Sequence, residues 1–329
     1  MKPFSKTISK SASGLFVLFF LVSVSSAASA WEPKKPINFV IMAGKGGGAD
    51  KMARLMQSII EKHKLSSKVF IPTNKPGGSG AESMIFLRSR TGIDRDHTLM
   101  VTLNSFYTTP LRQPNLGIDI SKFTPIGRMA EDTFLLWVHK DSGIHDISEF
   151  VKAAKAKGDG WIMAGTGKGQ EDQLLTGFLN SAYGLRMKYV PYKGGGRVAK
   201  ELAGKHADST VNNPSEQLGF FKAGTTRPLA AFADKRLPQF PRTPTFDELG
   251  VNGMTYYMQR SVVGAPGMSK EAQKYYQTLF SKVYQTSEWQ QYMAKKSLRG
   301  KFVTGKELKD YWVNEKSIHT RILKHIGEL

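Results

Sequence analysis

The chain has 329 residues, with 47 lysines and arginines against 27 aspartates and glutamates, giving a net charge of +20. It contains no cysteine, which excludes disulfide bonds, thiolate metal sites and the lipid-modified cysteine of a tethered lipoprotein. The basic residues are scattered and form no nucleic-acid motif, so a solvated basic surface, or a field that gathers anionic solutes, is favoured over a nucleic-acid partner.

The first thirty residues have the order of a secretory signal peptide. A basic start holds Lys2, Lys6 and Lys10, an apolar run covers residues 15–24, and Ala28-Ser29-Ala30 forms a small-x-small cleavage site. The apolar run is about half the length that crosses a bilayer. We therefore expect cleavage after Ala30 and a periplasmic protein, with an uncleaved N-terminal anchor as the alternative.

From residue 37 onward a short apolar strand, a glycine-rich loop and an amphipathic helix recur, which indicates a parallel α/β protein. The first unit has a strand over residues 37–42 and a loop over 43–48, with Asp50 as the predicted N-cap of the helix. In the next unit Ser79-Gly80-Ala81-Glu82 has the pattern of a capping box. The strand over residues 98–103 leads into a proline-rich segment that we expect to be a loop.

The same pattern restarts in the second half with a strand over residues 134–139. Its clearest helix start is Asn213-Pro214-Ser215-Glu216, because Asn stands at the cap, Pro at the first helical position and Glu at the third. A strand over residues 258–264 is predicted to cross back, and residues 270–326 are predicted to form helices.

These elements predict two lobes joined by crossing strands. The chain after residue 30 is about twice as long as a usual domain, and no long linker or low-complexity segment divides it. The predicted division is a signal peptide at residues 1–30, a first lobe formed by 31–132 with 259–329, and a second lobe formed by 133–258.

Four glycine-rich loops each lie between a predicted strand end and a predicted helix start. They cover residues 44–48, 76–80, 165–169 and 194–196. Such loops point backbone N–H groups at one spot, and the helix dipole adds positive potential there. Two loops in each half therefore predict a cleft that grips a small anion from both sides.

Patterns for other kinds of site are incomplete. Residues 44–49 match a dinucleotide pattern, but Pro72-Thr73-Asn74 ends the next strand without the acidic residue that would hold the ribose. Ser79 misses a nucleophile elbow because residue 81 is Ala, and the seven histidines show no metal-binding spacing. We therefore expect neither catalysis nor a metal or cofactor.

Three features keep two interpretations each. Asp50 either only caps its helix, or also fixes the loop and bonds a donor group of the ligand. Tyr192 and Lys193 stand at a strand end, where facing the cleft is favoured over covering the edge of the core. Phe106 and Tyr107 either form a wall of the ligand site or pack inside the protein.

At these same loops the sequence resembles the Bug family, the extracytoplasmic solute receptors of tripartite tricarboxylate transporters. The similarity spans nearly the whole chain after residue 30. The motifs that carry it are Gly46-Gly47-Gly48-Ala49-Asp50, Asn74-Lys75-Pro76-Gly77-Gly78-Ser79-Gly80, Ala164-Gly165-Thr166-Gly167-Lys168-Gly169, Val190-Pro191-Tyr192-Lys193-Gly194 and Pro241-Arg242-Thr243-Pro244-Thr245-Phe246.

The resemblance implies the type II periplasmic-binding-protein fold, in which two Rossmann-like lobes close on a ligand held between them. In that family loop amides, hydroxyls and bridging water hold a carboxylate. Lys45 and Lys168 depart from the family pattern and suggest a ligand with more than one carboxylate, unless they point into solvent. The candidate ligand-binding residues are Lys45, Gly46, Gly47, Gly48, Asp50, Gly78, Ser79, Asn104, Ser105, Thr166, Gly167, Lys168, Gly169, Tyr192, Lys193 and Asn212.

The sequence thus predicts a periplasmic solute-binding protein for a small organic carboxylate, with a di- or tricarboxylate favoured. The implied partners are the large and small membrane subunits of an ion-gradient-driven transporter, and the receptor itself is expected to be a monomer. A ligand-sensing receptor for a membrane sensor kinase is the main alternative, and an enzyme on the same scaffold is a weaker one.

Overall fold

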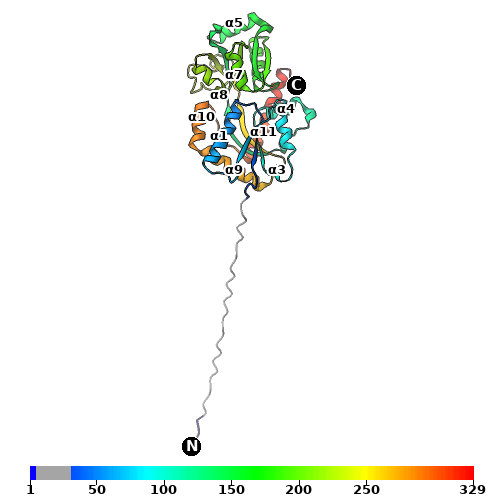
Figure 1. Ribbon diagram of the computed structural model, residues 1–329, viewed down its shortest axis with the longest axis vertical. Coiled ribbons are helices and arrows are strands. Elements are labelled where there is room, and N and C mark those ends of the chain that lie inside the picture. The colour runs from blue at the N-terminus through cyan, green and yellow to red at the C-terminus, as the bar shows by residue number, and fades with distance from the viewer. Residues whose placement is uncertain (5–30) are drawn as a thin grey trace. The chain divides into compact units, whose positions relative to one another are not determined.

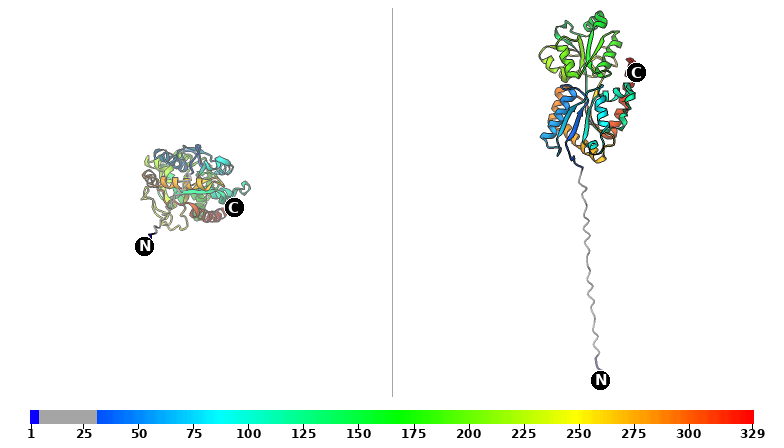
Figure 2. Two further views of the ribbon diagram at one scale, coloured as in Figure 1. Left: turned by 90° about the horizontal axis from the view of Figure 1, so that it is seen from below. Right: turned by 45° about the vertical axis from the view of Figure 1, so that its right-hand side comes forward.

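The computed structural model describes residues 1–4 and 31–329. Most of the predicted signal peptide and its cleavage site therefore lie outside the described residues. Two five-stranded sheets organise residues 31–329, each in its own lobe (Figures 1 and 2). No helix among the described residues combines the length and the apolar character needed to cross a bilayer.

The first sheet has the strand order β2-β1-β3-β10-β4. Three parallel strands form one side: β1 (Ile37–Ile41), β2 (Phe70–Asn74) and β3 (Thr98–Thr102). The returning strand β10 (Met258–Gly264) pairs antiparallel with both β3 and β4 (Thr124–Asp132). Strands β4 and β10, which follow later in the sequence, thus complete the sheet formed by β1, β2 and β3.

The second sheet repeats this plan with the order β7-β6-β8-β5-β9. The parallel strands are β6 (Ile162–Thr166), β7 (Lys188–Tyr192) and β8 (Ser209–Asn212). Both β8 and β9 (Thr226–Ala231) pair antiparallel with β5 (Leu135–His139). The carboxyl ends of the parallel strands therefore lead into the loops that the sequence marks with glycine.

Helices cover the faces of both sheets, as Figure 2 shows. In the first lobe they are α1 (Gly48–Lys62), α2 (Ala81–Arg88), α3 (Gly92–Asp96), α4 (Ser105–Arg112), α9 (Lys270–Gln285), α10 (Ser287–Lys296) and α11 (Gly305–His325). In the second lobe they are α5 (Ile147–Lys157), α6 (Glu171–Tyr183), α7 (Gly195–Ala203) and α8 (Pro214–Lys222).

The two lobes are joined where β4 runs into β5 and where β10 returns. Ala130 of β4 lies opposite Arg260 of β10, so the crossing segments pair with one another as they leave the first sheet. This arrangement confirms the predicted two-lobed α/β fold. The residue limits proposed for the lobes stay a prediction.

Aromatic packing forms the centre of the first lobe. The rings of Phe39 and Phe70 meet edge to face at 5.5 Å, and Phe280 of α9 lies 6.0 Å from Phe39. Burying a side chain of this size contributes about 2 kcal/mol, and the ring geometry adds to that. The contact between strands β1 and β2 and the late helix α9 ties the two ends of the chain into one lobe.

Two helix starts differ from the sequence prediction. Helix α1 begins at Gly48, so Asp50 is its third residue and not its N-cap; its carboxylate accepts the Gly46 N–H at 3.0 Å. Gly80, in the left-handed conformation, precedes α2, and the predicted Ser79 capping box is absent there. The hydroxyl of Ser79 instead donates to the Lys168 carbonyl at 2.8 Å.

The proline-rich segment predicted as a loop contains helix α4, with Pro110 inside it. The buried side chains of α4 stabilise the helix by more than the missing N–H of Pro110 destabilises it. Phe106 and Tyr107 are buried, and the Phe106 ring lies 5.1 Å from that of Trp312 in α11. These two aromatic side chains therefore pack inside the lobe, which settles the choice that the sequence left open.

One buried cluster carries an acid whose pKa is displaced. On α11, burial and repulsion by Glu131 raise the pKa of Glu315 to about 7, although Arg128 opposes them. The unfolded chain has an ordinary, lower pKa, so the folded state binds this proton more tightly. Its contribution to stability is therefore present at low pH and is lost as the pH rises through about 7.

We predict that Glu315→Gln raises the free energy of unfolding at pH 8 by about 1 to 3 kcal/mol and changes it little at pH 5. Urea denaturation of both proteins at the two pH values measures the difference. Glu61→Gln, at an exposed position of α1, is the matched control. Equal effects of Glu315→Gln at both pH values would contradict the prediction.

Candidate functional site

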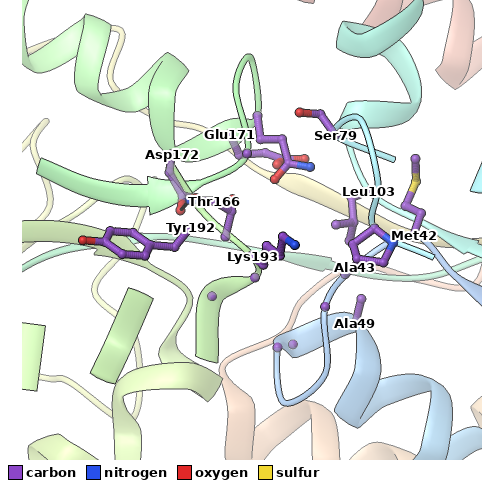
Figure 3. Close-up of a pocket in the computed structure, with 18 of the residues that line it drawn as sticks. Met42, Ala43, Ala49, Ser79, Leu103, Thr166, Glu171, Asp172, Tyr192 and Lys193 are labelled. Carbon is purple, nitrogen blue, oxygen red and sulfur yellow. Dashed lines mark hydrogen bonds between the residues drawn. The ribbon is translucent and has the colours of Figure 1, made fainter. Parts of the chain in front are cut away.

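A cavity of about 500 Å³ lies between the two lobes and is lined by loops from both. Figure 3 shows Met42, Ala43 and Leu103 of the first lobe facing Thr166, Glu171 and Lys193 of the second. Eight residues predicted from the sequence line it: Gly47, Gly48, Gly78, Ser79, Thr166, Gly167, Tyr192 and Lys193. All four predicted glycine loops contribute to the wall.

Two loops from opposite lobes close one end of the cavity. A Cβ placed on Gly44 would lie 2.9 Å from the Lys193 carbonyl oxygen, and one on Gly196 would lie 3.0 Å from the Gly46 carbonyl oxygen. Backbones therefore approach here at a distance that only glycine permits. The close approach brings two of the predicted glycine loops, one from each lobe, together at one site.

Glu216 connects the lobes at the same end. Its Oε1 accepts the N–H of Gly48 at 3.1 Å, and its Oε2 accepts the side-chain amide of Asn212 at 2.8 Å. A Cβ on Gly195, the first residue of α7, would fall on this carboxylate. Because helix N-termini attract negative charge, a carboxylate of the second lobe is held at the start of α1 in the first.

A second interlobe carboxylate comes from Glu171, the first residue of α6. Its Oε1 accepts the N–H of Ser105 at 3.1 Å, at the start of α4. Its neighbour Asp172 accepts the N–H of Thr166 at 2.7 Å, within the second lobe. Two first-lobe helices, α1 and α4, thus begin against carboxylates from the second lobe.

Burial raises the pKa values of Glu171 and Asp172. The pKa of Glu171 is raised mainly because burial penalises the charged form. Burial also raises the pKa of Asp172 well above its ordinary value, and repulsion by Glu216 and Glu171 adds to it. Three acids, Glu171, Asp172 and Glu216, line the cavity. None of them is among the ligand-binding residues predicted from the sequence.

Arg260, which lines the cavity, forms an ion pair that joins the two crossing strands. Arg260 of β10 donates through Nε to Asp132 of β4 at 3.1 Å, and both side chains are at least 97% buried. Burial raises the pKa of Asp132 to about 6, while the guanidinium pulls it down, so Asp132 carries its charge at neutral pH. A Cβ on Gly48 would fall on the Arg260 guanidinium, which explains the glycine at this position.

Tyr192 and Lys193 follow each other at the end of β7 and both line the cavity. In Figure 3 the ring of Tyr192 extends away from the first-lobe side chains. Lys193 is the cationic residue that the second lobe contributes to the lining. Arg260, from the crossing strand β10, is the other cationic residue there.

Eight predicted residues do not line the cavity. They are Lys45, Gly46, Asp50, Asn104, Ser105, Lys168, Gly169 and Asn212. Lys45 and Lys168 are exposed, so their contribution to binding a second carboxylate stays a prediction without support from the lining. Asp50 and Asn104 are buried behind the wall, where Asp50 holds the Gly46 amide and Asn104 accepts from the Gln259 N–H at 3.0 Å.

Other lining residues were not selected from the sequence. They are Met42, Ala43, Gly44, Ala49, Pro76, Gly77, Glu82, Leu103, Phe134, Gln170, Glu171, Asp172, Pro191, Gly194, Gly195, Asn213, Glu216, Met258 and Arg260. Several continue the predicted glycine loops, and that continuity could have identified them. In the described part of the chain no cluster of three or more His, Cys, Asp or Glu side chains is arranged to hold a metal ion.

Residues 52–327 match the family model described as Tripartite tricarboxylate transporter family receptor. The chain belongs to this family. It is 22% identical to Protein BugT of Bordetella pertussis over 246 residues, which cover 72% of each protein. The resemblance recognised in the sequence is thereby confirmed.

Two solved structures have the same fold. The periplasmic binding protein BugD superposes with a TM-score of 0.84 at 21% identity, over 90% of this chain and 98% of that one. MatC from Rhodopseudomonas palustris, solved with bound malate, gives a TM-score of 0.80 at 20% identity, over 88% and 99% of the two chains. The receptor fold is therefore shared across low sequence identity.

The buried ion pair of the receptor generates a prediction. Asp132→Ala leaves the Arg260 guanidinium buried without its carboxylate, so we expect the free energy of unfolding to fall by about 3 kcal/mol in urea denaturation. Replacing both residues, as Asp132→Leu with Arg260→Met, is expected to recover most of that loss, because no buried charge remains. A double variant as unstable as the single one would contradict this explanation.

Proposed function

We propose that this receptor captures a small organic carboxylate in the periplasm and delivers it to the two membrane subunits of a tripartite tricarboxylate transporter. One observation carries the proposal: the cavity between the lobes is lined by residues of both. A solute bound there adds contacts from the second lobe to those of the first. Differential affinity for the closed arrangement then drives closure, which a membrane partner can recognise.

The wall supports a carboxylate as the bound group. Helices α1, α6 and α7 all begin at the cavity, so the positive ends of three helix dipoles are directed toward it. Glu216 already lies at the starts of α1 and α7 and offsets part of this positive potential. Lys193 adds a positive charge at the second-lobe wall. MatC, a structural relative, was solved with bound malate, which is a carboxylate.

Binding without turnover is the form of activity that the lining supports. No histidine is among the lining residues of the described chain, so a serine there has no imidazole to act as a general base. The Ser79 hydroxyl donates to the Lys168 carbonyl, 2.8 Å away, and thereby joins the lobes. This arrangement serves as an interlobe contact, whereas a nucleophile needs its hydroxyl directed at a base.

We expect a panel of mono-, di- and tricarboxylates to raise the melting temperature of the receptor with at least one compound, and none to be converted. Stabilisation grows with the logarithm of ligand concentration, to about 2.7 kcal/mol at a hundredfold excess over Kd. Thermal melts and chromatography of the recovered compounds measure both. Receptor-dependent uptake by vesicles that hold both membrane subunits tests delivery. A shift with sugars or simple cations alone would refute carboxylate binding.

Lys193 is predicted to contribute directly to binding. Lys193→Met removes the positive charge while keeping most of the side chain, so we expect the Kd for the best carboxylate of the panel to rise about tenfold, or about 1.4 kcal/mol. Isothermal titration calorimetry measures it. Lys45→Met and Lys168→Met remove the same charge from exposed positions outside the lining and are expected to change the Kd less than about twofold. Equal effects of all three substitutions would show a general field and no local contact.

A further inference from the structure

The charge of the cavity wall differs from that of the chain. Four acidic side chains line it, Glu82, Glu171, Asp172 and Glu216, against the two cationic ones of Lys193 and Arg260. Arg260 is already paired with Asp132. Glu82 is in turn paired with Lys75. The wall of a highly basic protein is therefore rich in carboxyl groups, and this restricts the kind of carboxylate that can bind.

Glu216 occupies the place where an anion would otherwise be held. It accepts the Gly48 N–H at 3.1 Å, at the N-terminus of α1, and it lies against Gly195 at the N-terminus of α7. A carboxylate of the protein thus uses the amide that a ligand carboxylate would need at this end. A second anionic group of the solute would meet Glu216 as a like charge.

Asp172 extends the acidic wall on the second lobe. It is 3% exposed, and its bond to Thr166 keeps it at the start of α6 beside Glu171. Repulsion from Glu216 and Glu171 contributes to the raised pKa of Asp172, so these carboxylates lie near enough to disfavour one another's charge. A positive group between them would relieve that repulsion, whereas another carboxylate would increase it.

A hydroxyl without a hydrogen-bond partner lies next to the cavity wall. Ser215, next to Glu216 and 5% exposed, has a hydroxyl with no hydrogen-bond partner among the described residues. Its oxygen would be 3.2 Å from a Cβ on Gly48, a residue of the cavity wall. Ser215 itself is not among the lining residues, so Asp172 and Glu216 are the acceptors that face the cavity at this wall.

We propose that Asp172 and Glu216 are specificity-determining residues, which make the cavity select a small carboxylate that also carries a cationic amino group over a dicarboxylate of the same length. The inference rests on the proposed function, because it assumes that a carboxylate binds in this cavity. In this arrangement the carboxylate of the solute pairs with Lys193, and its ammonium group pairs with Asp172 and Glu216.

Matched pairs of compounds test the selection on the full mature protein. Succinate is compared with β-alanine, glutarate with γ-aminobutyrate, and adipate with δ-aminovalerate. Each pair shares one carboxylate and one carbon chain and differs only in whether the far end is a carboxylate or an ammonium group. We expect the amino compound of the best-binding pair to have a Kd at least about tenfold lower, by titration calorimetry.

Two variants then test the residues. Asp172→Asn and Glu216→Gln each replace a carboxyl group by an amide of the same size, and each is expected to lower the ratio of the two Kd values within a pair by about fivefold or more. Asp159→Asn, at an exposed position outside the cavity, should leave the ratio unchanged. Because the ratio is measured within one preparation, a loss of folded protein does not alter it.

The possible outcomes separate the two proposals. If no compound of either kind binds, carboxylate binding itself fails. If dicarboxylates bind more tightly than their amino partners, the receptor function stands and the selection by Asp172 and Glu216 is refuted. If the amino compounds bind more tightly but neither variant changes the ratio, the preference is real and these two residues do not cause it.

Discussion

The lobes of this receptor are joined at the cavity by carboxylates placed at helix N-termini. Glu216 and Glu171 both belong to the second lobe, and their oxygens accept N–H groups at the starts of α1 and α4 in the first. A helix N-terminus has unpaired N–H groups and a positive dipole end, so a buried carboxylate is stable there. The geometry of the cavity depends on this, because the same contacts set how close the opposing glycine loops lie.

The glycine loops and the carboxylates require one another. Gly48 and Gly195 have no side chain where Arg260 and Glu216 lie, and any Cβ at these positions would displace those charged groups. The sequence pattern predicts that the amides of such glycines bind an external anion. In the structure several of their amides are already bonded to acids of the chain, such as Gly46 to Asp50 and Gly48 to Glu216. The loops are thus anion sites that the protein partly fills itself.

Much of the fold could be predicted because its strands are apolar and its loops are marked by glycine. Strand β10 has the predicted bounds, and helix α8 begins at Pro214 as predicted. Strand β4 was missed because its sequence includes Pro125, Gly127 and several charged residues, which do not resemble a buried strand. Those charges are satisfied by partners distant in sequence, such as Asp132 by Arg260, and local patterns carry no information about such partners.

The loops that line the site could be predicted from the sequence, whereas the acidic side chains among its lining residues could not. An acid in the first turn of a helix is common for local reasons, so Glu171, Asp172 and Glu216 gave no signal of a role across the cleft. The contact of Glu216 with Gly48 joins residues 168 positions apart. Lys45 and Lys168, which suggested extra ligand charge, are exposed and are not among the lining residues, so their contribution to binding stays a prediction.

The surface and the cavity therefore act on a solute in different ways. The net charge of +20 produces a long-range field that raises the local concentration of anions, and salt screens that field. The cavity wall acts only at contact, where screening is weak and four acidic side chains confront the bound group. Under the proposed selection, a solute with one carboxylate and one ammonium group pairs with both the cationic and the acidic side chains of the wall, but it gains less from the field than a dianion does. Selectivity in this receptor would then arise after encounter, from the placement of buried charges, which overall composition does not reveal.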